Sequence, residues 1–305
     1  MRIVFFGSSS FSVPCLEKIR HHVAAVVTKK ARPKGRGYQV DDNAVKKAAM
    51  IAGLPLIEID SFKDDSARSI ADYHPDLFIV VSFGLIVPRW VLDIPSLAPI
   101  NIHPSLLPRY RGPSPIQWAL FQGDEVTGIT FIVMNEKMDE GDIIFQETVN
   151  IGVNENYTAL SHRLSEMAAD RLAGLIDGIG GQKITGIPQD NARASYCPII
   201  TKEMGKINWN ESARTIDCQV RAFIEWPTAF TYLDGKSLKI YGSTVLNESR
   251  NEVPGKILGI SKSGIDIMTG NGVLTIIDLQ LENKKRMNAY DFSRGYRDLA
   301  NKILN

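Results

Sequence analysis

The chain has 305 residues, a formal net charge of +1 and three cysteines, and these figures exclude several classes of protein. Hydrophobic residues make up 44% and charged residues 23%, which is typical of a folded globular protein and not of a disordered one. The length exceeds what one hydrophobic core usually supports, so two domains are expected. Three cysteines without CxxC spacing argue against a disulfide framework and against a cysteine-based zinc site.

The first residues, MRIVFFGSSSF, lack the basic region and the long apolar run of a signal peptide. No stretch approaches the ~20 consecutive apolar residues that a membrane span requires. We therefore expect a cytoplasmic protein in a reducing compartment, and we expect it to be a monomer.

Short apolar runs alternate with helical patterns over the first half of the chain. Strands are expected at residues 3–6, 23–27, 77–81, 100–102 and 128–133, and helices at 11–20, 43–52 and 157–176. Several of the strand runs are apolar at every position, which is typical of strands that are buried on both faces. The pattern predicts an α/β domain over residues 1–185 with a doubly wound, mainly parallel, Rossmann-like sheet.

The pattern changes after the long helix. Residues 186–202 carry two prolines and no clear period, so we place a linker at 186–204. Short strands separated by turn dipeptides such as Asp234-Gly235 follow, and they are expected at residues 232–233, 237–241, 255–260, 264–268 and 272–279. This arrangement predicts a small, antiparallel, OB-like β-barrel over residues 205–305.

Two clusters of positive charge lie in a sequence of otherwise balanced charge. One is formed by Lys284, Lys285 and Arg286, and the other places five Lys or Arg residues within positions 29–36, among prolines and glycines that disfavour helix and strand. Such a segment is either a solvated loop or a contact for the phosphates of a polyanion, and its composition leaves both interpretations open.

The segment GSSSF after the first strand could cradle a phosphate, as strand-to-helix turns do. However, the glycine fingerprint GxGxxG and the phosphate loop GxxxxGK[ST] are both absent from the sequence. A NAD-dependent enzyme and a P-loop nucleotide hydrolase are therefore disfavoured.

The densest polar segment is NIHPSLLPRYRG, residues 101–112, which ends an apolar run. Asn101 and His103 are separated by one residue, so an extended chain points both side chains to the same side. Open α/β sheets place their ligands at the carboxyl ends of the strands. A histidine can stabilise negative charge near neutral pH, and an asparagine can hydrogen-bond a carbonyl group. A purely structural pair at a strand end is the alternative, which spacing alone leaves open.

Acidic residues surround a glycine in the later segment MDEGD, residues 138–142. They could simply form a turn, or one carboxylate could fold back to hold and polarise His103. The sequence leaves Asp139 and Asp142 open for that role. The other histidines lack the spacing of metal ligands, so no metal is expected.

The run NIHPSLLPRYRG, followed by GITFIVMNEKMDEGDII at residues 128–144, resembles the folate-dependent formyltransferases. That resemblance implies the transfer of a formyl group from 10-formyltetrahydrofolate to an amine. It implies a catalytic set made of Asn101, His103 and Asp139. It also implies two folate-contacting loops, one containing Ser105, Leu106, Leu107 and Pro108, and the other containing Phe83, Leu85, Ile86 and Val87.

Within this family, the chain resembles over nearly its full length the members that formylate the methionine carried by initiator tRNA for translation initiation. The resemblance lies in RPKGRG at residues 32–37 and in a C-terminal domain that begins with IDCQVRAFIEWPTAF at residues 216–230. It implies tRNA contacts by Arg32, Lys34, Arg36, Lys284, Lys285 and Arg286. We expect the loop at residues 32–37 to be mobile without RNA.

Three other functions fit parts of the same pattern. A formyl-folate hydrolase and an amino-sugar formyltransferase would share the α/β core, whereas a non-catalytic RNA-binding protein would keep the scaffold without the chemistry. The loop at residues 32–37 argues against the first two, and the complete set of Asn101, His103 and Asp139 argues against the third.

Overall fold

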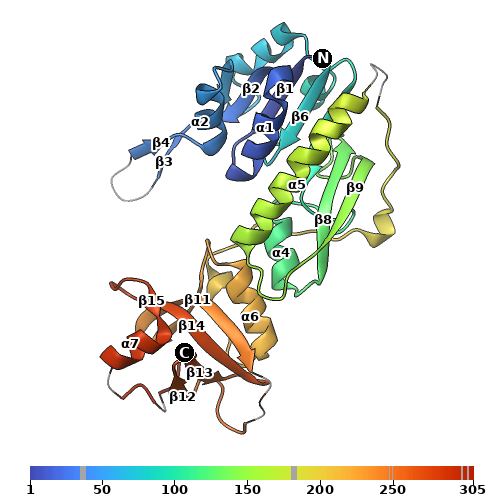
Figure 1. Ribbon diagram of the computed structural model, residues 1–305. Coiled ribbons are helices and arrows are strands. Elements are labelled where there is room, and N and C mark those ends of the chain that lie inside the picture. The colour runs from blue at the N-terminus through green and yellow to red at the C-terminus, as the bar shows by residue number, and fades with distance from the viewer. Residues whose placement is uncertain (35–38, 180–183, 247, 249, 297, 301) are drawn as a thin grey trace. The chain divides into compact units, whose positions relative to one another are not determined.

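The computed structural model describes residues 1–34, 39–179, 184–246, 248, 250–296, 298–300 and 302–305 (Figure 1). The chain divides into two compact units, each with a hydrophobic core of its own. Unit 1 comprises Met1–Pro115, Thr127–Val149 and Ser161–Cys197, and unit 2 comprises Ile116–Val126, Asn150–Leu160 and Pro198–Asn305.

Unit 1 is built on a seven-stranded sheet with the strand order β5-β2-β1-β6-β7-β8-β9. The strands are β1 (Ile3–Gly7), β2 (Val23–Lys29), β5 (Leu56–Ile59), β6 (Leu77–Val81), β7 (Ala98–His103), β8 (Val126–Val133) and β9 (Asp142–Asn150). β5, β2, β1, β6 and β7 pair in parallel, and β8 runs antiparallel to β7. The predicted doubly wound, mainly parallel sheet is confirmed, and β1 and β6 are buried along their whole length.

The helices of the first half are α1 (Val13–Ile19), α2 (Ala44–Ile51), α3 (Arg89–Leu92), α4 (Pro115–Phe121) and α5 (Tyr157–Gly178), with 3-10 turns at η1 (Ser10–Ser12), η2 (Arg20–His22) and η3 (Asp65–Tyr73). α1 and α5 lie side by side over one face of the sheet (Figure 1), where Lys18 pairs with Asp170 at 2.7 Å. The Ser165 hydroxyl on α5 also donates to the carbonyl of Phe11. No helix in the described part of the chain combines the length and the apolar character needed to cross a bilayer.

The order of the strands fixes where a ligand can bind. From β1 the chain extends the sheet to one side through β2 and β5, and then to the other side through β6 and β7. The switch point therefore lies between β1 and β6, where the loops at the carboxyl ends of the strands separate. Ser12, which follows β1, donates to the carbonyl of Val81 at the end of β6, and Val81 is paired with Ile102 of β7. This carboxyl edge gathers residues 8–12, 82–88 and 103–112.

Part of the basic segment adopts regular structure, which the sequence analysis did not expect. β3 (Arg32–Lys34) and β4 (Gln39–Asp41) form an antiparallel two-stranded ribbon, in which Pro33 is paired with Val40. Both strands of such a ribbon are edge strands, and an edge strand tolerates proline because one side of it needs no N–H donor. Residues 35–38, including Arg36, lie outside the described residues, so the mobility of this loop stays a prediction.

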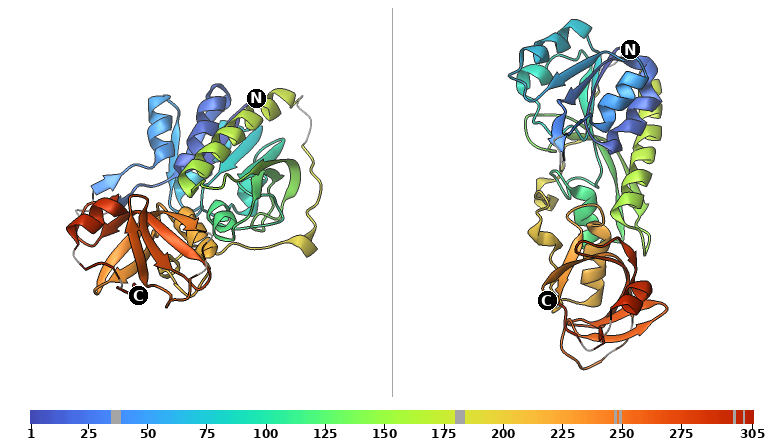
Figure 2. Two further views of the ribbon diagram at one scale, coloured as in Figure 1. Left: turned by 60° about the horizontal axis from the view of Figure 1, so that its bottom comes forward. Right: turned by 90° about the vertical axis from the view of Figure 1, so that its left-hand side faces the viewer.

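The chain after α5 remains attached to unit 1. Ile187 and Ile143 exchange backbone hydrogen bonds of 2.8 and 2.9 Å, and the amide of Cys197 donates to the carbonyl of Arg111 at 2.8 Å. In Figure 2 this segment, drawn in yellow, runs beside β9. The stretch that the sequence analysis assigned to a linker is therefore, up to Cys197, hydrogen-bonded into the first unit.

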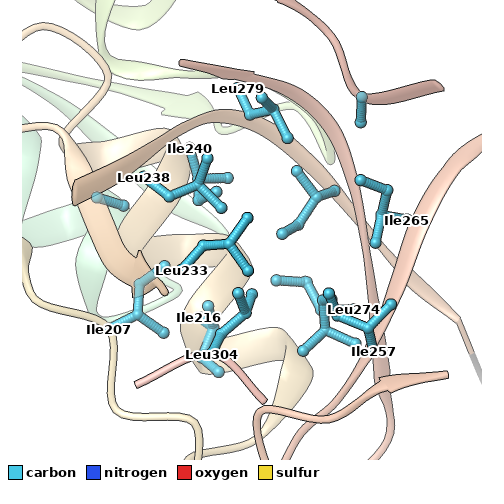
Figure 3. Packing of buried hydrophobic residues seen from close by; sticks show 14 of the residues in the cluster. Ile207, Ile216, Leu233, Leu238, Ile240, Ile257, Ile265, Leu274, Leu279 and Leu304 are labelled. Carbon is cyan, nitrogen blue, oxygen red and sulfur yellow. The ribbon is translucent and has the colours of Figure 1, made fainter. Parts of the chain in front are cut away.

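Unit 2 contains the antiparallel sheet expected from the turn dipeptides. Its strands are β10 (Ala229–Leu233), β11 (Lys236–Leu246), β12 (Ile257–Ser261), β13 (Gly264–Met268), β14 (Val273–Leu281) and β15 (Met287–Asn288). The order is β10-β11-β14-β13-β12, with β15 paired to β14. The helices α6 (Ala213–Ala222) and α7 (Ala289–Gly295) were not predicted. Figure 3 shows the core of this unit, where aliphatic side chains from the strands, α6 and Leu304 converge.

Residues Lys302–Asn305 join the two outer strands of this sheet. The amide of Asn305 donates to the carbonyl of Tyr232 in β10 at 3.1 Å, and the amide of Leu304 donates to the carbonyl of Gly255, just before β12, at 2.9 Å. The amide of Ile257 donates to Lys302 in turn. Both edge strands of the sheet are therefore hydrogen-bonded to the same short segment. In a closed barrel the two edge strands would be hydrogen-bonded to each other.

The three cysteines provide a test of the packing. All are free and buried, and burial raises the pKa of Cys15 to about 12 and that of Cys197 to about 11. Burial also raises the pKa of the Cys218 thiol. Because the thiolate is the reactive form, we expect the native protein at pH 8 to react only very slowly with an aromatic disulfide reagent, and all three thiols to react once the chain is unfolded. A thiol that reacts within seconds in the native state would contradict this packing.

Candidate active site

Asn101, His103 and Asp139 meet at the carboxyl edge of the unit 1 sheet. Asn101 and His103 extend from β7, and Asp139 lies in the loop between β8 and β9. The amide nitrogen of Asn101 donates to Oδ1 of Asp139 at 3.2 Å, and Nδ1 of His103 lies 3.6 Å from Oδ2 of the same carboxylate. The side chains of His103 and Asp139 are only 6% and 14% exposed. Of the two carboxylates left open by the sequence, Asp139 is the one beside His103, whereas Asp142 is exposed at the start of β9.

The orientation of the His103 ring is set by a main-chain group. Nε2 of His103 donates to the carbonyl of Tyr110 at 2.8 Å, and since a carbonyl oxygen only accepts, Nε2 carries the hydrogen. Nδ1 is thereby directed toward Asp139. Tyr110 has φ +59°, which is uncommon for a residue with a side chain and is often found near functional sites. Tyr110 lies within the motif NIHPSLLPRYRG, but nothing in the sequence indicates this role for its carbonyl group.

The turn that carries Asp139 is held in an unusual conformation. Asp139 has φ +54°, and its Oδ2 accepts a hydrogen bond from the amide of Gly112 at 2.8 Å. The side-chain amide of Gln189 donates to the carbonyls of Asp139 and Gly141, both at 2.7 Å. A Cβ atom on Gly141 would lie 1.9 Å from the carbonyl oxygen of Val133, so only glycine fits this position. Sequence reasoning missed Gln189, which lies in the stretch assigned to the linker.

Arg111 is a buried cation beside this turn, with 1% of its surface exposed. Its Nε and Nη2 donate to the side-chain oxygen of Gln189, and Nη2 also donates to Asn191. Its Nη1 donates to the hydroxyl of Tyr196 and lies 3.3 Å from a carboxylate oxygen of Glu140. Each of the three guanidinium nitrogens therefore donates to at least one oxygen, which a buried cation requires.

The first predicted folate loop is fixed by buried hydrogen bonds. The Ser105 hydroxyl donates to the carbonyl of Arg109 at 2.7 Å, and the Thr130 hydroxyl donates to the carbonyl of Ser105 at 2.6 Å. The amide of Leu107 donates to Thr130, and Gln146 donates to the carbonyl of Leu107. Ser105 and Leu107 are buried and shape the loop, whereas Leu106 and Pro108 keep part of their surface exposed.

The second predicted folate loop also contains both buried and exposed side chains. Phe83 and Val87 are buried in the core of unit 1, and the Phe83 ring packs against Phe6 at 5.5 Å between centroids. Ile86, in contrast, is 71% exposed. Together with Leu85 it lines a pocket of about 340 Å³, whose other walls are Ser61, Phe62, Lys63, Pro88 and Trp90.

The predicted tRNA-binding residues lie in separate places. Arg32 and Lys34 belong to β3, and Arg36 lies outside the described residues. Lys284 and Lys285 are exposed in the turn before β15. Arg286 is bound to Asp278 at 2.5 Å and stacks on the ring of Tyr241, and its hydrogen bond to Asp278 raises the pKa of its guanidinium.

Across the described residues, no group of three His, Cys, Asp or Glu side chains is arranged to hold a metal ion.

Two family models together match most of the chain. The Formyl transferase family model matches residues 1–175, and the model of the formyl transferase C-terminal domain matches residues 199–297. The chain belongs to the formyl transferase family. The resemblance inferred from the two sequence motifs is thereby confirmed. As an enzyme of this family, the formyl transferase carries its Asn101, His103 and Asp139 cluster within the N-terminal match.

Relatives of this formyl transferase cover nearly its whole length. It is 39% identical to the methionyl-tRNA formyltransferase of Alkaliphilus oremlandii over 97% of the chain and 96% of that relative. It is 40% identical to the methionyl-tRNA formyltransferase of Syntrophus aciditrophicus over 99% of the chain and 98% of that relative. Among solved structures, HypX from Aquifex aeolicus in complex with tetrahydrofolic acid has a similar fold, with a TM-score of 0.65 at 16% identity, over 99% of this chain and 48% of HypX.

Proposed function

We propose that this formyl transferase moves the formyl group of 10-formyltetrahydrofolate to the α-amine of methionine on initiator tRNA, in the cytoplasm, before translation begins. The observation that carries the proposal is the meeting of Asn101, His103 and Asp139 at the carboxyl edge of the sheet. The acceptor is supported by relatives that are 39% and 40% identical over nearly the whole chain and are named methionyl-tRNA formyltransferases.

The reaction is an acyl transfer by direct attack of the amine on the formyl carbon. A C–N bond forms to the methionine nitrogen, and negative charge develops on the formyl oxygen of the tetrahedral intermediate. Collapse of that intermediate breaks the bond to N10 of the folate, which takes up a proton. The folate carries the one-carbon unit throughout, so no covalent intermediate on the protein is required.

Two donors can reach the developing negative charge. The amide of Asn101 has two N–H groups, and Asp139 accepts from the nitrogen that bears them, so one N–H is left for the formyl oxygen. Because Nε2 of His103 is engaged with the Tyr110 carbonyl, only Nδ1 can serve as its donor to substrate, and it does so in the positively charged form of the ring. A fixed donor of this kind contributes roughly 2.7–4 kcal/mol to transition-state stabilisation.

Asp139 serves both of these donors and the amine. Its Oδ1 accepts from Asn101, and its Oδ2 lies 3.6 Å from Nδ1 of His103. The negative charge stabilises a positively charged imidazole ring, and through a water molecule it can take the proton that the amine loses. The three side chains act as a unit because Asp139 contacts both of the others.

The remaining surfaces are assigned by the same proposal. The apolar pocket beside Leu85 and Ile86 offers a wall against which a flat pterin ring can pack, and the loop at Leu106 and Pro108 offers a second contact for the folate. We assign catalysis to residues 1–185 and tRNA binding to residues 205–305 together with the basic segment. Lys284 and Lys285 are the exposed cations of the C-terminal cluster, whereas Arg286 is already paired with Asp278.

The proposal is tested by mixing the protein with 10-formyltetrahydrofolate and charged initiator tRNA and by following formylmethionyl-tRNA and free formate. Formylated methionine on the tRNA is the expected product. Formate without formylmethionine would identify a hydrolase. Formyl transfer to a nucleotide-linked amino sugar in a parallel reaction, but not to tRNA, would identify a sugar formyltransferase. Binding of tRNA with neither product would leave an RNA-binding protein.

Neutralising Arg36 is expected to weaken the use of tRNA. Because each lost phosphate contact removes about one unit from the slope of log K against log salt, Arg36→Ala should flatten the salt dependence of tRNA binding by about one unit. Filter binding at several salt concentrations measures this slope. Arg68→Ala removes an exposed arginine from η3 and is the control. An unchanged slope in Arg36→Ala would exclude that residue from the tRNA site.

A further inference from the structure

We infer that Gln189 is a positioning residue for the Asp139 carboxylate, and that the buried cation Arg111 in turn positions Gln189. The inference rests on the proposed role of Asp139 in formyl transfer and extends it to a segment that lies outside both matched family regions. Neither residue contacts the reacting atoms. Their effect reaches the reaction through the main chain of the turn that carries Asp139.

The side-chain amide of Gln189 has no alternative orientation at this place. Its nitrogen donates to the carbonyls of Asp139 and Gly141, and its oxygen accepts from Nε and Nη2 of Arg111 at 3.1 and 2.8 Å. A flipped amide would turn its oxygen toward two carbonyl oxygens and its N–H groups toward a cation. Gln189 therefore joins a fixed positive charge on one side to two main-chain acceptors on the other.

The turn depends on this contact because its conformation is not one that a residue with a side chain favours. A residue such as Asp139 in the left-handed region is strained, and it stays there only where surrounding groups hold it. Gln189 holds the carbonyl of Asp139 itself. Once that carbonyl is released, the backbone can relax and carry the carboxylate away from Asn101 and His103.

The position of Arg111 is fixed as firmly as that of Gln189. Besides Gln189, its guanidinium contacts Asn191, Tyr196 and Glu140, so rotation would leave buried donors without acceptors. Its own main chain is also tied down, because the Arg111 amide donates to the carbonyl of Ser195 at 2.9 Å. The next residue, Gly112, supplies the amide that donates to the Asp139 carboxylate. The cation and the carboxylate are thus linked through both a side chain and the chain itself.

The substitution Gln189→Glu tests this role directly. It keeps an oxygen for Arg111 but places a second oxygen against the carbonyls of Asp139 and Gly141. We expect kcat for formyl transfer to fall on the order of 10²-fold, because a reacting group displaced by about 1 Å has an effect of that size. The KM values for folate and tRNA should stay unchanged, since neither is bound by Gln189. Gln122→Glu introduces the same charge at an exposed position and is the matched control, with wild-type kcat expected.

A double-mutant cycle separates positioning from a general structural role. If Gln189 acts through Asp139, Gln189→Glu should cost little further activity in an Asp139→Asn background. Independent, additive losses would overturn the inference. If Gln189→Glu does not fold, Arg111→Lys replaces it in the cycle with Asp139→Asn. Lysine keeps the positive charge but cannot hold the Gln189 oxygen with two N–H groups. Wild-type kcat in a folded variant would likewise overturn it.

A second readout does not depend on turnover. The ring resonances of His103 should move in Asp139→Asn, should move in the same direction in Gln189→Glu, and should be unchanged in Gln122→Glu. Unmoved resonances in Gln189→Glu would overturn the inference even if the protein transferred no formyl group at all. Failure of the proposed function would instead appear in the wild-type assay as missing formylmethionyl-tRNA.

Discussion

Replacing His103 by alanine is expected to lower kcat for formyl transfer by about 10²–10⁴-fold, while tRNA binding is retained. The change removes the Nδ1 donor beside Asp139 and leaves Asn101 as the remaining side-chain donor to the formyl oxygen. Asp139→Asn should give a loss of similar order, because the neutral amide no longer stabilises a positively charged ring. Steady-state kinetics with both substrates, together with tRNA binding measured separately, check this expectation.

The control for this experiment is the other acidic residue that the sequence left open. Asp142 is exposed at the start of β9, so Asp142→Asn should change kcat by less than about twofold, as expected for a side chain that makes no contact with the reacting groups. Near-native turnover in His103→Ala would remove His103 from the mechanism. A large loss in Asp142→Asn would show that the wrong carboxylate has been assigned.

Replacing Arg111 by methionine is expected to lower the free energy of unfolding of unit 1 by about 3–5 kcal/mol. Removal of one partner of a buried ionic network has this effect, because the groups left behind have lost both water and their partner. The Gln189 oxygen, the Asn191 oxygen and the Glu140 carboxylate would all lose the same donor. Methionine fills much of the volume, so the loss reports on the polar contacts more than on a cavity.

Hydrogen exchange of the amides in β6 and β7 measures this effect within unit 1, which matters because two units need not unfold together. Arg68→Met makes the same change at an exposed arginine of η3 in the same unit, and it should alter stability by less than about 1 kcal/mol. Equal effects of the two substitutions would contradict the importance of the buried network.

The sequence was sufficient for the strands that are buried on both faces and insufficient for others. β1 and β6 are apolar at every position, so their sequence indicates a central strand without further context. β9 was not predicted, because it lies at the edge of the sheet and its residues are mostly exposed or half-buried. α6 was also missed, although Ala213, Ile216 and Val220 recur at helical spacing on its buried face.

The residues of the site also differ in how far the sequence predicts them. The two-residue spacing of Asn101 and His103 on a strand predicts that both side chains lie on one side, because strand geometry is regular. The choice between Asp139 and Asp142 depends on the path of a loop, which no periodicity encodes. The Tyr110 carbonyl and the Gln189 amide were out of reach, because a main-chain acceptor has no sequence signature and Gln189 is separated from Asp139 by 50 positions.

That separation of 50 positions along the chain has a consequence for folding during synthesis on the ribosome. At a synthesis rate of about 5–20 residues per second, Asp139 is made roughly 2.5–10 seconds before Gln189. During that interval the main-chain carbonyl of Asp139 lacks its donor from Gln189. Arg111 likewise lacks its acceptors on Gln189, Asn191 and Tyr196. The nascent sheet can therefore form well before the reaction centre does, and the emergence of the Gln189–Cys197 stretch is the event that completes it.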